Sequence, residues 1–185
     1  TQPFFKAVLT LSSHEPFDVP MSPLIKGHDH EALFLNACHY TDAMLGRFIA
    51  SAKTKPWWQN TLVIITADHG HRSPGDKPLE DVERFHIPML WLGGALAVRG
   101  NNDVYSSQTD IVHTLLTQLN CEADNFSFSK NILGNNAQSF AAYFFNNGYG
   151  FVKPGVHLLY DNEGNHFIKQ TGANAADVEV SKAYQ

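Results

Sequence analysis

The sequence predicts an α/β fold, with a mainly parallel sheet flanked by helices and a small antiparallel meander after it, in one domain spanning residues 1–185. Two observations predict the α/β part, residues 1–120. Apolar, β-branched runs alternate with amphipathic helical segments, and the apolar runs end abruptly in polar residues. A third observation predicts the meander at residues 121–170, where short aromatic-rich runs alternate with turn residues. Residues 171–185 are expected to form a weakly ordered or docking tail.

Three apolar runs are the predicted strands of the sheet: Phe4–Leu11, Leu62–Ile65 and the run that follows His86. Such continuous apolar runs are typical of strands that are buried on both faces. Between and after them, apolar residues three and four apart predict helices over Glu31–Lys55 and Ile111–Leu119. The strands therefore alternate with helices.

The meander is predicted from four short runs that are separated by Asn-, Gly- and Pro-containing turns. The four runs are Phe140–Phe145, Tyr149–Val152, Val156–Tyr160 and His166–Ile168. Each turn is short enough to join neighbouring antiparallel strands.

Asp68, His69 and Gly70 come directly after the predicted strand Leu62–Ile65, and the whole chain is organised around them. In open α/β sheets, chemistry collects where strands end at their carboxyl edge. A carboxylate and a neutral imidazole suit Zn²⁺ or Mn²⁺, and glycine leaves room for a substrate or an ion. The alternative is a strand cap, in which the aspartate binds turn amides and the histidine lies on the surface.

His14 occupies the same class of position, since Pro16 cannot continue the strand that precedes it. This histidine is either a ligand of a substrate or phosphoryl group, or an ordinary turn histidine. Ser12 and Ser13 invite a nucleophile interpretation with His14 as base. Neighbouring strand residues point to opposite faces, however, and no Gly-x-Ser-x-Gly elbow is present, which disfavours that interpretation.

Five other polar residues are weighed against ordinary surface or structural roles. Arg72 and Lys77 lie in the loop after the aspartate motif and are candidate anion contacts. His39 and Asp42 are three residues apart on a helix, so they form either a metal pair or, as we favour, a solvated or packing face. His86 precedes its strand, which places it at the sheet edge opposite the aspartate motif and favours a structural role.

Composition excludes several function classes. The formal net charge of −5 gives no electrostatic footprint for nucleic acid, and no apolar run is long enough to span a bilayer. Cys38 and Cys121 are expected to be free thiols. The chain opens with Thr1 and Gln2 rather than an initiator methionine, so we expect a soluble piece of a longer protein.

Five pieces of the chain match one family in their order. They are Phe4–Phe17 with Ser-Ser-His-Glu-Pro-Phe, Tyr40–Phe48, Ile65–Gly70 with Ala-Asp-His-Gly, Phe85–Gly94, and Ser107–Ile111 followed by Leu115-Leu116. Together they resemble the sulfatase branch of the alkaline phosphatase superfamily, and within it the lipoteichoic acid synthase and phosphoglycerol transferase proteins. The resemblance implies an alkaline phosphatase-like fold.

By that resemblance, Asp68 and His69 are metal ligands, and His14 contacts the phosphate or sulfate group, with Arg72 as a further substrate contact. The implied cofactor is a divalent metal, with Mn²⁺ as the first expectation and Ca²⁺, Mg²⁺ or Zn²⁺ as alternatives. The implied reaction is displacement at phosphorus or sulfur by a metal-bound hydroxyl. No nucleophile is assigned in this chain, because Cys38 lacks the Cys-x-Pro-x-Arg setting of sulfatases.

The first functional hypothesis is therefore the C-terminal part of a metal-dependent sulfatase or phosphoglycerol transferase, inactive by itself and completed by the missing N-terminal half of the same domain. Its substrates would be sulfate or phosphate esters of a glycan or lipid headgroup. The parent protein would lie at the extracytoplasmic face of a membrane, in the cell envelope. The alternatives are a phosphodiesterase or phosphomutase relative, or a non-catalytic module that binds an anion or glycan.

Overall fold

A computed structural model describes residues 3–97 and 99–185, so the opening residues Thr1 and Gln2 lie outside the described part. The chain forms two compact units, Thr1–Arg99 and Gly100–Gln185, which we call the first and second units. The boundary falls before the helix predicted at Ile111–Leu119, whereas the sequence changes character only after Asn120.

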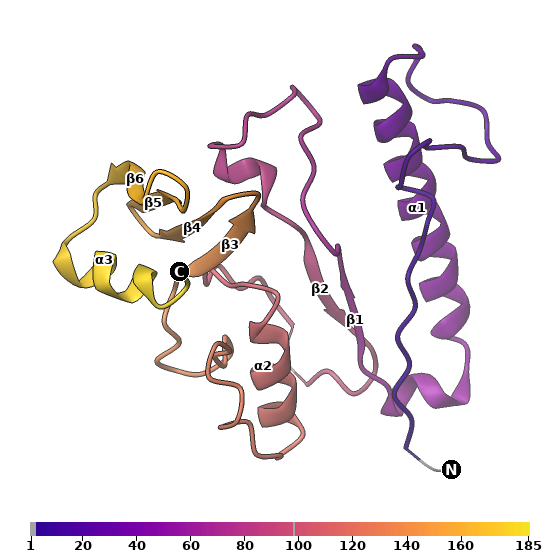
Figure 1. Cartoon of the computed structure of the whole chain (residues 1–185). Helices are drawn as coiled ribbons and strands as arrows, with labels where there is room; N and C mark the ends of the chain where they lie inside the picture. The colour runs from indigo at the N-terminus through magenta and orange to yellow at the C-terminus, as the bar shows by residue number, and fades with distance from the viewer. Residues whose placement is uncertain (1–2, 98) are drawn as a thin grey trace. The chain divides into compact units, whose positions relative to one another are not determined.

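The described residues of the first unit form one long helix, two strands and two short 3₁₀ helices (Figure 1). Helix α1 spans His30–Ala52, as the apolar spacing predicts, and the side chain of Asp29 caps it by accepting from the Ala32 N–H. The remaining elements are η1 (Pro56–Asn60), β1 (Val63–Thr66), η2 (Val82–Arg84) and β2 (Met89–Leu92). Among the described residues, no helix is both long and apolar enough to cross a membrane.

Strands β1 and β2 pair antiparallel, with Val63 opposite Leu92 and Thr66 opposite Met89. The prediction of a mainly parallel sheet is therefore wrong for the described residues, in which every strand pair is antiparallel. The physical reason is that the polar segment between the two strands returns the chain to the same end of the sheet. The end of β1 and the start of β2 thus coincide, which also corrects the prediction for His86: it precedes β2 and lies at the same end as the aspartate motif.

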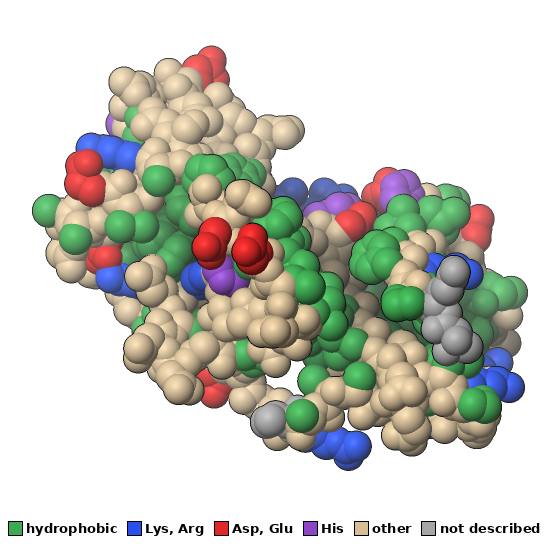
Figure 2. All heavy atoms as spheres, turned by 90° about the horizontal axis from the view of Figure 1, so that it is seen from below, with side chains coloured by type: hydrophobic (Ala, Val, Ile, Leu, Met, Phe, Trp, Pro, Cys, Tyr) green, Lys and Arg blue, Asp and Glu red, His purple; other side chains and the backbone are tan. Residues whose placement is uncertain are grey.

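The predicted strand Phe4–Leu11 is extended but is not paired as a strand within the described part of the chain. Its large apolar side chains are exposed, from 71% for Phe4 to 88% for Phe5. Strand β1 is only half-buried, because the sheet of this unit has two strands that pair only with each other. Hydrophobic side chains are accordingly visible on the face of the molecule in Figure 2. Burial on both faces, which the apolar pattern predicts, is thus not observed.

The second unit contains the predicted antiparallel meander, and the prediction is confirmed. Strands β3 (Ala141–Phe145), β4 (Gly148–Lys153), β5 (Val156–Asp161) and β6 (His166–Thr171) lie side by side in chain order. Its hydrophobic core gathers around Phe151, Val156 and Leu158 of the two central strands.

The tail contains a helix, α3 (Ala175–Lys182), so of the two expectations for this segment, weak order or docking, the structure agrees with docking. Its first turn carries a capping box between Asn174 and Asp177, and Val178 packs against the core. Lys153 of β4 forms an ion pair with Asp177. The bond from Lys153, followed by the bond from the Asn174 N–H, lowers the pKa of Asp177.

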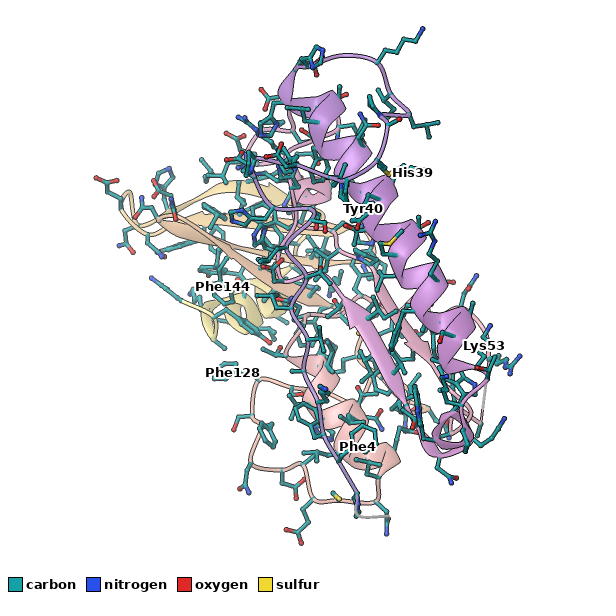
Figure 3. The ribbon with its side chains drawn as sticks, turned by 90° about the vertical axis from the view of Figure 1, so that its right-hand side faces the viewer. Phe4, His39, Tyr40, Lys53, Phe128 and Phe144 are labelled. Carbon is teal, nitrogen blue, oxygen red and sulfur yellow. The ribbon has the colours of Figure 1, made fainter. Side chains whose placement is uncertain are left out.

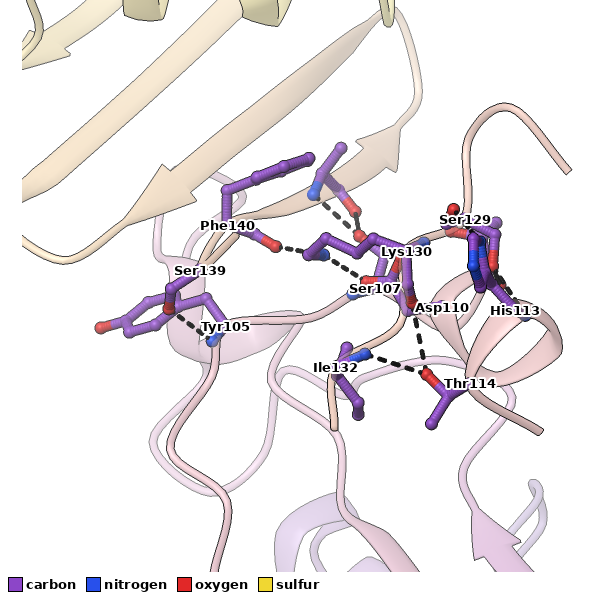
Figure 4. Close-up of polar contacts among 12 residues, drawn as sticks. Tyr105, Ser107, Asp110, His113, Thr114, Ser129, Lys130, Ile132, Ser139 and Phe140 are labelled. Carbon is purple, nitrogen blue, oxygen red and sulfur yellow. Dashed lines mark hydrogen bonds and ion pairs between the residues drawn. The ribbon is translucent and has the colours of Figure 1, made fainter. Parts of the chain in front are cut away.

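A buried aspartate joins helix α2 (Asp110–Gln118) to the segment that follows it (Figure 4). Asp110 is 2% exposed and accepts from the Ser107 N–H (2.8 Å) and the Lys130 N–H (2.9 Å). The Lys130 ammonium pairs with the same carboxylate and donates to the Phe140 carbonyl at 2.8 Å. Both free cysteines expected from the sequence, Cys38 and Cys121, are observed as thiols.

Replacing Asp110 by alanine should destabilise the second unit by about 3–5 kcal/mol, because it leaves a buried ammonium and two amides without their acceptor. Urea unfolding followed by far-ultraviolet circular dichroism measures this change in the free energy of unfolding. The matched control is Asp124→Ala, which truncates an exposed aspartate of the same unit and should stay within about 0.5 kcal/mol of wild type. Equal stability of the two variants would contradict the role given to Asp110.

Candidate active site

The loop after β1 presents a carboxylate and an imidazole side by side to solvent. The His69 N–H donates to Asp68 Oδ1 at 3.0 Å, and the side chains are 73% and 68% exposed for the histidine and the aspartate. His69 Nδ1 lies 2.8 Å from the Gly70 carbonyl, an oxygen that can only accept. Nδ1 therefore carries a proton, and in the neutral ring Nε2 is the nitrogen with a lone pair.

The two groups fit the ligand chemistry of a divalent metal. His69 Nε2 and Asp68 Oδ2 are 3.8 Å apart. A metal about 2.0–2.2 Å from each ligand atom bridges such a separation. The described residues contain no group of three or more His, Cys, Asp or Glu side chains arranged to hold a metal, so a complete coordination shell would need further ligands.

Gly70 is required by a close approach of two backbone segments. A Cβ atom at this position would lie 1.9 Å from the Arg84 carbonyl oxygen and 2.8 Å from Phe85 Cα. The glycine therefore lets the aspartate loop pack against the end of η2. This is a different reason from the room for an ion that the sequence suggested.

His14 lies in a tight turn before α1. The turn is closed by bonds from the His14 N–H to the Leu11 carbonyl (3.0 Å) and from the Phe17 N–H to the His14 carbonyl (2.9 Å). The His14 ring is exposed, and its Nδ1 donates to the Glu15 carbonyl at 2.8 Å. Phe17 has a φ of 65° and is 5% exposed, so the turn ends in a buried aromatic anchor.

The first turn of α1 contacts both the His14 turn and the aspartate loop through an aromatic cluster, Phe17, His30, Phe34 and His71. His71 stacks on Phe34 with ring centroids 3.8 Å apart and on His30 at 5.5 Å. Phe17 packs edge-on against His30 at 5.2 Å and against Phe34 at 5.7 Å. Both loops that carry candidate site residues therefore pack against His30 and Phe34 at the N-terminal end of α1.

Two polar contacts reinforce this cluster. His30 Nε2 donates to Glu15 Oε1 at 2.8 Å, and the Gly75 N–H donates to Glu31 Oε2 at 2.7 Å. The bond from His30 lowers the pKa of Glu15, while burial lowers the pKa of His71. The cluster therefore combines an ionised carboxylate with a neutral stacked imidazole at pH 7.

The other candidates from the sequence occupy surface positions. Arg72 is exposed and contacts Asp76 at 3.5 Å, and the Lys77 N–H donates to the Arg72 carbonyl at 2.8 Å, which closes the loop. His39 and Asp42 are both exposed on α1, and Figure 3 shows His39 pointing away from the body of the helix.

Sequence reasoning missed the aromatic cluster. His30 and Phe34 are four residues apart, so they share one face of the helix, and this spacing was the available signal. The signal does not identify Phe17 and His71 as the partners, because they come from loops whose paths no periodicity predicts.

Comparison with known proteins identifies the class. A solved structure of a protein in the alkaline phosphatase superfamily from Vibrio parahaemolyticus superposes with a TM-score of 0.67 and 25% identity over 95% of this chain and 48% of that one. The lipoteichoic acid synthase LtaP from Listeria monocytogenes has the same fold, with a TM-score of 0.64 and 18% identity over 95% of this chain and 52% of that one. The fold is therefore that of the alkaline phosphatase superfamily.

Within that superfamily, the chain belongs to the sulfatase family, whose sequence model matches residues 1–121. Lipoteichoic acid synthase from Staphylococcus aureus (strain USA300) is 24% identical over 200 residues, 97% of this chain and 30% of that protein. Arylsulfatase K from Canis lupus familiaris is 32% identical over 89 residues, 46% of this chain and 17% of that protein. The chain thus spans less than a third of these curated relatives.

Replacing Gly70 by alanine should destabilise the first unit by about 1–3 kcal/mol, because the new methyl group forces the aspartate loop away from η2. The matched control is Gly46→Ala on α1, where an added Cβ meets nothing within 4 Å. That variant should gain about 0.5–1 kcal/mol from helix propensity. Thermal unfolding of both proteins measures the two changes, and a Gly70→Ala protein as stable as Gly46→Ala would contradict the close approach.

Proposed function

We propose that this chain is the C-terminal part of a metal-dependent hydrolase or phosphoglycerol transferase of the sulfatase family. Membership of the family supports an enzyme. The observation that carries the specific proposal is that two loops contact the N-terminal end of α1: the loop bearing the exposed Asp68–His69 pair through His71, and the turn bearing His14 through Phe17 and Glu15. This arrangement supports one site made from two loops.

In the proposed site, Asp68 and His69 hold a divalent metal, with Mn²⁺ as the first choice. The ion, when bound, lowers the pKa of a hydroxyl nucleophile and offsets negative charge on the group being transferred. The carboxylate contributes the charge that attracts the ion. The lone pair on His69 Nε2, which follows from the Nδ1 contact with Gly70, contributes the second ligand.

His14 is proposed to contact an oxygen of the phosphate or sulfate group. Its Nδ1 is occupied by the Glu15 carbonyl, so Nε2 is the atom available for an oxyanion. A charged donor makes a stronger hydrogen bond to an anion than a neutral one. Arg72 lies on the neighbouring loop and is proposed as a second, longer-range anion contact.

The nucleophile and an acidic metal ligand are proposed to come from the other half of the catalytic domain. The first unit offers a surface for it: the exposed apolar segment Phe4–Leu11 and a two-stranded sheet whose apolar strands are only half-buried. Such a segment buries its side chains by joining a larger sheet. The share of the Vibrio parahaemolyticus structure that the chain covers, 48%, agrees with a domain of about twice this length.

The substrates are proposed to be sulfate or phosphate esters of a glycan or lipid headgroup. Similarity to lipoteichoic acid synthase over nearly the whole chain favours phosphoglycerol transfer, whereas similarity to arylsulfatase K covers less than half of it. The proposed location is the extracytoplasmic face of the membrane, as part of a membrane-anchored parent protein.

Two substitutions in the full-length protein distinguish the roles. Asp68→Asn removes a charged metal ligand, so bound metal and turnover should both collapse. His14→Ala should leave metal content near wild type and lower the rate by about 10²–10³, the usual effect of losing one preorganised donor to a developing oxyanion. Metal analysis of the purified variants and turnover of a phosphodiester and a sulfate ester measure these outcomes.

The matched control is Asp42→Asn, an exposed aspartate on α1, which should change neither quantity. Loss of metal from His14→Ala together with its retention in Asp68→Asn would mean that the two roles are exchanged. Wild-type protein that turns over neither ester and binds no divalent ion would favour a non-catalytic binding module.

A further inference from the structure

His30 is the first residue of α1, and its side chain contacts both loops of the proposed site in different ways. Its Nε2 donates to Glu15 Oε1 at 2.8 Å, in the turn that carries His14. Its ring stacks on His71 of the aspartate loop, with centroids 5.5 Å apart and planes only 7° from parallel. The ring also receives the edge of Phe17 at 5.2 Å.

The bond to Glu15 contributes little to stability, because the carboxylate is 65% exposed and such surface pairs are screened by water. Its effect on geometry is larger. Glu15 is covalently joined to His14, and the Glu15 carbonyl holds His14 Nδ1 at 2.8 Å. A shift of Glu15 therefore moves both the backbone of His14 and the acceptor that orients its ring.

Packing alone does not account for this arrangement. Phe34 supplies the face on which His71 stacks most closely, at 3.8 Å, and Phe17 supplies the buried anchor of the turn. Either contact needs only an apolar ring on α1. A histidine at position 30 adds an N–H directed at a carboxylate that would otherwise be free to rotate in solvent.

We propose that His30 is a positioning residue that fixes the orientation of His14 relative to Asp68 and His69, by donating from Nε2 to Glu15 while its ring stacks on His71. This inference rests on the proposed function, in which His14 contacts the transferring group. In this proposal His30 acts through Glu15 and His14 rather than on the substrate.

Two substitutions distinguish the hydrogen bond from His30 to Glu15 from the packing of the His30 ring. His30→Phe keeps an aromatic ring for Phe17 and His71 but removes the donor. His30→Gln keeps an N–H donor within reach of Glu15 and removes the ring. In the full-length protein, His30→Phe should lower kcat by about 10- to 100-fold with a small change in KM, as expected when a catalytic contact is misplaced. His30→Gln should recover most of that loss.

Two further variants guard against a folding effect. His39→Phe makes the same change on the exposed side of α1 and should retain wild-type kcat. Glu15→Ala breaks the proposed bond from its exposed end, and the double variant His30→Phe with Glu15→Ala should be no slower than the slower single variant. Additive losses would overturn the proposal, since they would mean that the two residues act independently.

A spectroscopic arm makes the test independent of activity. Histidine labelled with ¹³C at Cε1 gives ten signals in this chain, and the His14 signal is assigned by its absence in His14→Ala. The His14 signal should move toward that of a free histidine in His30→Phe and Glu15→Ala, but not in His39→Phe. An unmoved signal would overturn the positioning role. A moved signal with an unchanged rate would instead overturn the role of His14 in the reaction.

Discussion

The stacking of His71 on Phe34 is the contact on which the arrangement of the candidate site depends. It joins the loop that follows β1 to helix α1, whose first residue, His30, lies 41 positions before His71 in the chain. Aromatic pairs of this kind contribute about 0.5–1.5 kcal/mol beyond the area they bury. The aromatic cluster and the two polar contacts beside it thus join both loops to α1.

The two units differ in how fully their apolar side chains are buried and their charged side chains are paired. In the second unit, the core residues of β4 and β5 are buried. The carboxylates of Asp110 and Asp177 are paired with lysines. In the first unit, the apolar strands are half-buried and Phe4–Leu11 is exposed along its length. In the proposed function, the aspartate and histidine of this unit would provide two metal ligands, and the exposed apolar surface would be covered by the other half of the catalytic domain.

The sequence predicted the local elements well where periodicity is strong. Helix α1, the meander and its turns, and the motif after β1 follow from apolar spacing and turn residues. The direction of β2 could not be predicted in this way, because an apolar run carries no information about the strand beside it. Because β2 was expected to run parallel to β1, His86 was predicted at the sheet edge opposite the aspartate motif, whereas it lies at the same end. Whether the tail docks or is weakly ordered was left open, because one of its contacts, Lys153, lies 24 residues away from Asp177 in the chain.

The candidate site was predictable only in part. Asp68, His69 and His14 could be predicted because they follow apolar runs. The residues that position them show no comparable pattern in the sequence. The contacts of Glu15, His30 and His71 can be recognised only in the structure, because the three residues lie in separate segments: the His14 turn, α1 and the aspartate loop. Gly70 was noticed for a reason different from the observed one, a backbone contact with Arg84 that no local pattern encodes.

If the N-terminal part of α1 holds both loops, nuclear Overhauser contacts in the full-length protein labelled with ¹³C at Phe and His should show it. We expect cross-peaks between the rings of His71 and Phe34, whose centroids are 3.8 Å apart, and between those of Phe17 and His30, at 5.2 Å. A spectrum in which the ring of His71 contacts neither Phe34 nor His30, in protein that is otherwise folded, would contradict it.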